Sequence, residues 1–243
     1  MIEKYKKAGY TYADKRSQVR DWKKAPDRIL GVFADGHLPY TIDRDNDKEI
    51  AETVPTLAEM TKTALESLDK HEKGFLLQVE GGRIDHAGHA NDPAGSLWDQ
   101  LAFDDAIGVA LEYLEKHPDT LLVVTSDHGT ANPGLNGMGP SYRESTECFG
   151  RLAKFRGSYE ALQQKLAAEK KEAGSISQEA VREMILDMSG GIKLTDEEAA
   201  IIADTANGEL PLELNASLRS VNGILGQVLG NHTGMGWTST NHT

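Results

Sequence analysis

Two short stretches of the chain concentrate side chains that can bind metal ions. They are Glu80, Asp85, His86 and His89 in the first stretch, and Asp127 and His128 in the second. Asp85 and His89 are four residues apart, so they share one face if this stretch is helical and can converge on one ion. Imidazole nitrogen combined with carboxylate oxygen, without thiolate, suggests a zinc ion of the open, catalytic kind.

The presence of two such stretches indicates a site for more than one ion. Two ions about 3.5–4 Å apart would clamp the attacking and leaving oxygens of a phosphoryl transfer. A carboxylate such as Glu80, among oxygen ligands only, would suit the harder magnesium ion. Taken singly, each piece has an ordinary explanation: Asp127 as a cap beside a satisfied histidine, Asp85 as a helix cap, or Glu80 paired with Arg83.

The elements that must position these side chains follow from the apolar pattern. Continuous apolar runs at 29–33, 75–79 and 120–125 predict parallel strands buried on both faces. Residues 54–71 and 94–116 carry apolar side chains at helical spacing. Strands that alternate with helices in this way predict an α/β sheet with crossover helices.

Both polar stretches begin where a predicted strand ends. Glu80 directly follows the second strand, and Asp127 lies two residues beyond the third. In open α/β sheets, ligands bind outside the carboxyl ends of the strands, so we expect both stretches at the same edge. Gly81 and Gly82 fit a tight turn with close backbone approach. The shared location of the two polar stretches favours a metal site over a separate ordinary explanation for each residue.

The rest of the chain has a different character. Between 143 and 229 the pattern indicates four or five amphipathic helices, no strand and no repeat, and we assign this region no chemistry. A Gly-rich loop carrying His232 and His242 then follows. We therefore predict a metal-binding α/β core at 1–139, a helical insertion or cap at 140–230 and a return to the core at 231–243.

Composition excludes several classes of partner. Lys and Arg total 26 against 38 Asp and Glu, a net charge of −12, which argues against nucleic acid and anionic membrane surfaces. No stretch approaches the roughly 20 apolar residues that span a bilayer. The single cysteine, Cys148, excludes an intrachain disulfide and a cysteine zinc cage. The residues after Met1 show no apolar signal-peptide core.

The two polar stretches resemble the metal-binding heart of the alkaline phosphatases. The resemblance lies in VEGGRIDHAGH at 79–89, in TSDH at 125–128 and in the closing His-Thr pair, and it runs from about Leu30 to Asn136 and again from Gly234 to Thr243. It implies a partial three-layer α/β/α sandwich in which the helical segment is a variable insertion. It also implies hydrolysis of phosphate monoesters through a phosphoserine, two zinc ions and one magnesium ion.

The resemblance further implies a role for each candidate residue. Asp85, His89 and His242 would hold the first zinc, Asp127 and His128 the second zinc, and Glu80 the magnesium, while His86 would lie near the phosphate or the magnesium shell. His232 competes with His242 for the last zinc position. His242 is preferred because the segment from Trp237 to Thr243 looks more like the C-terminal motif of the family.

Parts of the family pattern are missing from this sequence. No serine has the Asp-Ser-Ala setting of the nucleophile, and the upstream aspartate, the hydroxyl ligand of magnesium and the phosphate-clamping arginine also lack counterparts. We therefore expect an inactive fragment that lacks strands on both sides of the motif region. For the complete protein, the resemblance implies a periplasmic or extracellular homodimer that acts on small-molecule phosphate monoesters.

Three alternatives stay open at this point. A phosphodiesterase, sulfatase or phosphoglycerate mutase of the same superfamily would share the two-metal core, although the carboxylate of Glu80 favours a monoesterase. A zinc-binding or scaffold protein that has lost its nucleophile would keep the ligands without the reaction. An α/β domain whose histidines bind nothing would have neither the metal site nor the reaction. The sequence pattern does not specify the physiological substrate, the oligomeric state or the role of the insertion.

Overall fold

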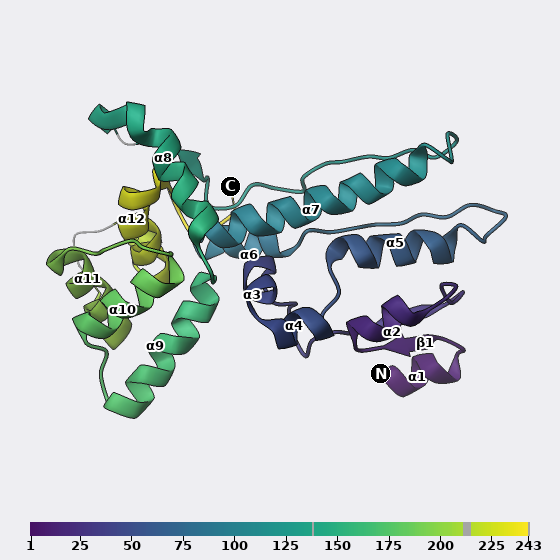
Figure 1. The fold of residues 1–243 in the computed structure, drawn as a ribbon, viewed down its shortest axis with the longest axis horizontal. Helices are drawn as coiled ribbons and strands as arrows, with labels where there is room; N and C mark the ends of the chain where they lie inside the picture. The colour runs from purple at the N-terminus through teal and green to yellow at the C-terminus, as the bar shows by residue number, and fades with distance from the viewer. Residues whose placement is uncertain (138, 211–214, 243) are drawn as a thin grey trace. The chain divides into compact units, whose positions relative to one another are not determined.

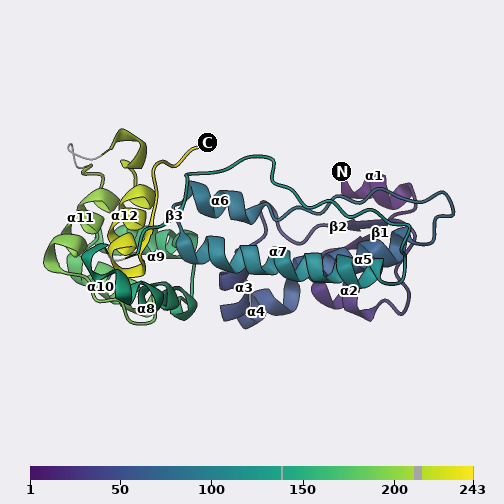
Figure 2. The ribbon, with the colours of Figure 1, turned by 90° about the horizontal axis from the view of Figure 1, so that it is seen from above.

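The computed structural model describes residues 1–137, 139–210 and 215–242. The chain forms two compact units, of which unit 1 comprises Met1–Arg83 and Trp98–Thr125, and unit 2 comprises Ile84–Leu97 and Ser126–Thr243. Figures 1 and 2 show the elements from two directions. Met138, residues 211–214 and Thr243, which fall in the three predicted domains in turn, lie outside the described residues. The division at 139 and 230 stays a prediction.

Unit 1 is mostly helical, with one short parallel strand pair. Its elements are α1 (Ile2–Lys7), β1 (Thr11–Ala13), α2 (Arg16–Asp21), β2 (Ile29–Gly31), α3 (Thr41–Asn46), α4 (Lys48–Thr53), α5 (Leu57–Leu68) and most of α7 (Pro93–Leu114). The strands pair from Thr11 opposite Ile29 to Ala13 opposite Gly31. β2 confirms part of the strand predicted at 29–33, and α5 and α7 confirm the two predicted helices.

Helix α5 shows how local sequence sets an element in unit 1. Thr56 caps its first turn by accepting a hydrogen bond from the Glu59 N–H, and the Glu59 carboxylate accepts one from the Thr56 N–H. This reciprocal capping box satisfies two backbone donors that a helix start leaves unpaired. Glu59 also accepts hydrogen bonds from Arg16 and Arg20, so α2 is tied to α5.

The strands predicted at 75–79 and 120–125 are not formed. Within the described residues, 75–79 and 121–124 make no backbone hydrogen bonds. Burial nevertheless alternates along 75–79, as it does in an extended chain. A strand satisfies its N–H and C=O groups only on a neighbouring strand, and no described segment lies in that position. Residues 75–79 thus keep the burial pattern of an extended chain, but the described residues make none of the strand-to-strand hydrogen bonds that a sheet requires.

The described residues of unit 2 form helices and one two-residue antiparallel strand pair. Its elements are α6 (Arg83–His89, beginning at the unit boundary), the start of α7, β3 (Gly134–Leu135), η1 (Gly139–Glu144), α8 (Ser145–Gly150), η2 (Arg151–Lys154), α9 (Tyr159–Ala173), α10 (Gln178–Met188), α11 (Asp196–Asn207), η3 (Ala216–Leu218), α12 (Val221–Thr233) and β4 (Met235–Gly236), where η marks a 3-10 helix. The described part of 143–229 contains helices and no strand, as the sequence predicts.

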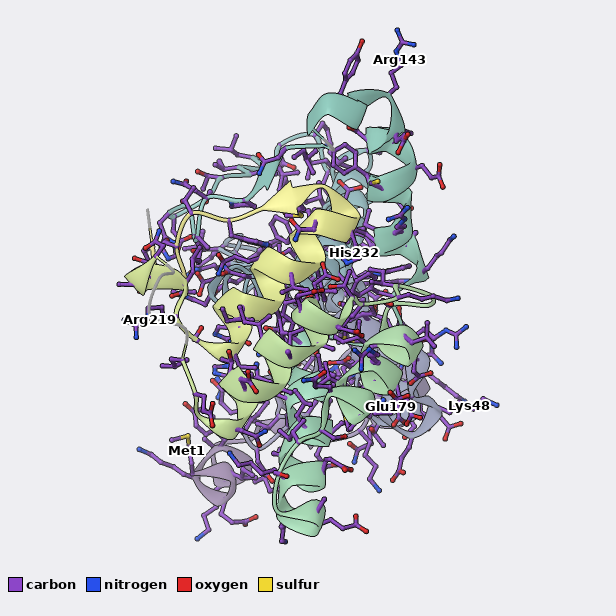
Figure 3. The ribbon with its side chains drawn as sticks, turned by 90° about the vertical axis from the view of Figure 1, so that its left-hand side faces the viewer. Met1, Lys48, Arg143, Glu179, Arg219 and His232 are labelled. Carbon is purple, nitrogen blue, oxygen red and sulfur yellow. The ribbon has the colours of Figure 1, made fainter. Side chains whose placement is uncertain are left out.

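The core of unit 2 lies among α9, α10, α11 and α12. Tyr159, Ile185 and Leu225 are fully buried there, and Ile202 is 1% exposed. Each of these helices begins at a Ser or Thr whose hydroxyl accepts a backbone N–H of the first turn, the usual N-cap arrangement. Figure 3 shows α12 running through this packed group, with His232 in its last turn.

Candidate metal centre

Helix α6 presents two of the candidate ligands on one face. Asp85 and His89 are one turn apart, and His89 Nε2 lies 3.5 Å from Asp85 Oδ1. The helix ends at His89 because Asn91 adopts a left-handed conformation (φ 52°). Asp92 then begins α7 by accepting the Gly95 N–H, and it also accepts the Tyr159 N–H. Asp92 therefore fixes the far end of α6 within the core of unit 2.

A glycine on α6 lets the second stretch approach closely. A Cβ added to Gly88 would lie 3.0 Å from Thr130 Cγ2 and 3.3 Å from the Thr130 carbonyl oxygen. This close approach allows Thr130 Oγ1 to donate a 2.6 Å hydrogen bond to Asp85 Oδ1. Sequence reasoning missed Thr130. The available signal was Gly88, an otherwise unfavourable residue inside a predicted helix.

The C-terminal segment brings His242 to the same place. Thr130 and His242 form an isolated antiparallel bridge, and the Ala131 N–H donates to the Asn241 carbonyl at 2.8 Å. His242 Nε2 consequently lies 3.0 Å from His89 Nε2 and 3.6 Å from Asp85 Oδ1. Residues more than 150 positions apart in the chain are therefore neighbours.

Backbone carbonyls determine which imidazole nitrogens face the cluster. His89 Nδ1 lies 2.6 Å from the Thr240 carbonyl oxygen, and His128 Nδ1 lies 3.2 Å from that of Gly129. A carbonyl oxygen can only accept, so Nδ1 donates in each of these bonds and Nε2 is the ring nitrogen left to face the cluster. Metal-binding histidines are commonly oriented in this way.

In the second stretch, His128 and not Asp127 belongs to the group of close potential ligand atoms. One potential ligand atom from each of Asp85, His128 and His242 lies within 4.8 Å of the other two. The ring centroids of His128 and His242 are 4.0 Å apart. Asp127 is 86% exposed, and its Oδ2 lies 3.4 Å from His128 Nε2. Carboxylate and imidazole donors gathered this closely could hold a metal ion.

Asp85 is held in its charged form. Burial alone would raise the pKa of this carboxyl, but the Thr130 hydrogen bond and the nearby His89, His242 and His128 lower it below its ordinary value. A carboxylate binds a metal ion through its ionised form, so this environment prepares Asp85 to act as a ligand.

Three other candidates are not among the clustered side chains: His232 lies elsewhere in unit 2, His86 lies on α6, and Glu80 belongs to unit 1. His232 Nε2 lies 3.0 Å from Glu198 Oε1 and borders a cavity of about 310 Å³ that Arg151 and Lys193 also line. His86 follows Asp85 on α6 and is half-buried. Glu80 is an exposed residue of unit 1.

Comparisons with known proteins agree on one family. The Alkaline phosphatase family model matches residues 1–199. Alkaline phosphatase 3 of Bacillus subtilis is 35% identical over 208 residues, 79% of this chain and 43% of its own length. Alkaline phosphatase 4 of the same organism is 28% identical over 100% of this chain and 46% of its own length. The chain thus spans less than half the length of these curated relatives.

The solved structures give the same result for the fold. The crystal structure of Thermus thermophilus alkaline phosphatase matches with a TM-score of 0.86 and 33% identity, over 100% of this chain and 50% of that chain. The predicted alkaline-phosphatase-like α/β architecture is therefore confirmed. None of the described helices combines the length and the apolar character needed to cross a membrane.

Proposed function

Because the chain belongs to the alkaline phosphatase family, we propose that it carries the metal-binding part of a phosphate monoester hydrolase. The observation that supports this most strongly is the meeting of Asp85, His128 and His242, with His89 beside them. Family membership supports phosphatase chemistry in general, and this cluster is where we place it.

The proposal assigns the ions as follows. Asp85, His89 and His242 hold one zinc, Asp127 and His128 hold a second zinc, Glu80 holds a magnesium ion, and His86 lies near the phosphate or behind the ligands. His242 is chosen over His232 because it lies within 3.0 Å of His89, whereas His232 is engaged by the Glu198 carboxylate.

The residues of this chain prepare the site before any ion binds. When bound, zinc ions would stabilise the negative charge that spreads over a phosphoryl group in transfer. The Thr130 hydrogen bond lowers the pKa of Asp85, and the Thr240 carbonyl holds the His89 ring with Nε2 toward Asp85. Ligands held in place in this way lose little conformational freedom on binding.

The nucleophile is proposed to come from outside this chain. Ser126, the serine nearest to the second stretch in sequence, donates its hydroxyl proton to the His128 carbonyl at 2.7 Å. That bond supports the turn around His128. The chain by itself is therefore proposed to bind zinc without hydrolysing phosphate monoesters.

Metal titration of the chain tests this proposal directly. Calorimetry with zinc, and visible absorption with cobalt in its place, should detect binding that the His242→Ala variant weakens about 100-fold or more. His232→Ala is the matched control and should bind as the parent does. Equal losses in both variants, or no binding by the parent, would contradict the assignment.

The reaction needs a second test. Co-expression with the part of the Thermus thermophilus enzyme that this chain does not match should release phosphate from p-nitrophenyl phosphate, while the chain alone should not. Faster turnover of bis-p-nitrophenyl phosphate would favour a phosphodiesterase. Export to the periplasm or medium, and a homodimer of the whole enzyme, are proposed on family membership alone.

A further inference from the structure

Asn91 is a fully buried polar residue that links two segments of the candidate metal centre. It is 0% exposed and lies just beyond the end of α6. Its Nδ2 donates to the Ser239 carbonyl at 2.8 Å and to the Gly88 carbonyl at 3.1 Å. Ser239 belongs to residues 237–242, which we name the ligand segment because they end at His242. One side chain therefore joins the end of α6 to the ligand segment.

The two carbonyls determine how the amide of Asn91 is oriented. A carbonyl oxygen only accepts hydrogen bonds, so the NH2 group of the amide and not its Oδ1 must face both of them. Oδ1 is then buried with no hydrogen-bond partner among the described residues. A buried acceptor without a partner costs free energy, so the two bonds that Nδ2 donates are what favours this arrangement.

The backbone and the packing around Asn91 suit few residue types. Its φ of 52° is left-handed, a conformation that asparagine and glycine adopt more readily than most residues. A Cβ added to Gly226 of α12 would lie 2.6 Å from Asn91 Cβ and 3.2 Å from Trp237 Cδ1, so Gly226 lets both side chains pack closely on α12. Of asparagine and glycine, only asparagine also carries donors for the Ser239 carbonyl.

The bond to Ser239 lies between the two contacts that the ligand segment makes with His89. The next residue, Thr240, places its carbonyl oxygen 2.6 Å from His89 Nδ1. Farther along the segment, His242 Nε2 lies 3.0 Å from His89 Nε2. Among the described residues, no donor other than Asn91 Nδ2 bonds to the Ser239 carbonyl. The amide of Asn91 is therefore placed where it can set both contacts.

We infer that Asn91 is a positioning residue of the metal centre, whose amide holds the ligand segment against the end of α6 so that His242 and His89 meet. Backbone hydrogen bonds also tie the ligand segment to Ala131, beyond the second polar stretch. Asn91 supplies a tie to α6 that uses no proposed metal ligand. Only the effect on zinc binding rests on the proposed function.

The Asn91→Gly variant tests this inference, because glycine keeps the left-handed backbone and removes the amide. In the metal-free chain, hydrogen exchange at the Ala131 and Thr238 amides should become about tenfold faster, since both amides pair across the loosened ligand segment. Zinc affinity measured by calorimetry should fall about tenfold. The visible spectrum of bound cobalt should shift toward that of His242→Ala. Either unchanged exchange or unchanged zinc affinity would overturn the inference.

Asn207→Gly is the matched control in the same unit. Asn207 Nδ2 donates to the Ile176 carbonyl and its Oδ1 accepts the Ile176 N–H, both at 2.9 Å. This variant also loses two side-chain bonds to the backbone, at the end of α11 and outside the ligand segment. It should lower the thermal midpoint and keep the zinc affinity and cobalt spectrum of the parent. An equal loss of zinc affinity in both variants would show that Asn91 acts only on general stability.

Asn91→Asp separates the loss of donors from the loss of side-chain volume. Aspartate is close to asparagine in size and tolerates the same backbone conformation. Its carboxyl group offers at most one donor where the amide offers two, so this variant should weaken zinc binding as well. Zinc affinity equal to that of the parent would contradict the role given to the amide.

The metal site and the positioning role can fail separately. A parent chain that binds no zinc would contradict the proposed function. Hydrogen exchange at Ala131 and Thr238 in the metal-free chain would then still decide whether Asn91 holds the ligand segment. Zinc binding by the parent that Asn91→Gly leaves unchanged would contradict the positioning role alone.

Discussion

The helices of unit 2 and residues 75–79 and 121–124 of unit 1 both carry large aliphatic side chains, with opposite outcomes. Ile185, Leu225 and Leu229 of α10 and α12 are completely buried, while Leu76 and Leu121 are 94% and 84% exposed. The difference is that the helices satisfy their backbone groups internally, whereas 75–79 and 121–124 make no backbone hydrogen bond with any described residue.

This contrast follows from where each element makes its hydrogen bonds. A helix satisfies its backbone internally and needs only a packing surface. A strand needs a neighbour for its backbone as well as for its side chains, so removing that neighbour leaves both unsatisfied. The packing of unit 2 should therefore add more to the stability of the chain than residues 75–79 and 121–124 do.

The largest expected effect tests this contrast through side-chain truncation. Leu225→Ala should lower the free energy of unfolding by about 2–5 kcal/mol, because it removes buried methyl groups and leaves a cavity. Leu121→Ala should change it by less than about 0.5 kcal/mol, since its side chain is exposed. Chemical denaturation of both variants measures the difference. Equal losses would show that 121–124 is packed after all.

Asp99 should make unit 1 respond to pH. Burial raises the pKa of this carboxyl to about 6, although Thr41 donates two hydrogen bonds to it. The folded state then holds a proton that the unfolded state releases between about pH 4 and 6, so stability falls as pH rises through that window. Asp99→Asn should remove the fall and stabilise unit 1 at pH 7.5 by up to about 3 kcal/mol.

The control for Asp99 is the same variant at pH 4. There the carboxyl is neutral in the folded state, so Asp99→Asn and the parent should unfold together. Hydrogen exchange in α3, which lies in unit 1, is the local measurement. A stabilisation that persists unchanged at pH 4 would contradict the assigned cause.

Glu59 should give unit 1 the opposite pH response. Burial would raise the pKa of Glu59, but hydrogen bonds from Arg16, from the Thr56 N–H and from Arg20 outweigh it and lower the pKa to about 2. Stability from this group is present above about pH 4.5 and is lost as pH falls toward 2. Glu59→Gln should cost about 1–2 kcal/mol at pH 7, an amount reduced by partial exposure. Denaturation at pH 7 and pH 3 should show a smaller difference at the lower pH.

The smallest expected effect concerns unit 2 alone. Thr130→Val removes the hydrogen bond to Asp85 and should weaken zinc affinity about tenfold. Thr240→Val is the matched control, because the carbonyl that orients His89 belongs to the backbone and is kept. Zinc titration compares the two variants. Equal affinity in both would mean that Thr130 does not prepare Asp85.

Local pattern was enough to place the first pair of candidate ligands. Asp85 and His89 were expected on one face if their stretch is helical, and α6 brings His89 Nε2 within 3.5 Å of Asp85 Oδ1. Helical spacing is a property of neighbouring residues, so no distant contact was needed. The choice of His242 over His232 rested on family resemblance, and the short distance from His242 to His89 supports it. Metal binding by these residues stays a prediction.

By itself the sequence determined the helices, the family and the residue types at the candidate site. Periodicity and motifs depend only on residues that are close together in the sequence. Only the tertiary structure decided that Thr130 contacts Asp85 across Gly88, that Thr240 orients His89, and that the apolar segments 75–79 and 121–124 are uncovered. The physical reason is the same in each case. Hydrogen bonds between distant segments depend on which backbone groups come within about 3 Å, and that distance is set by the packing of the chain.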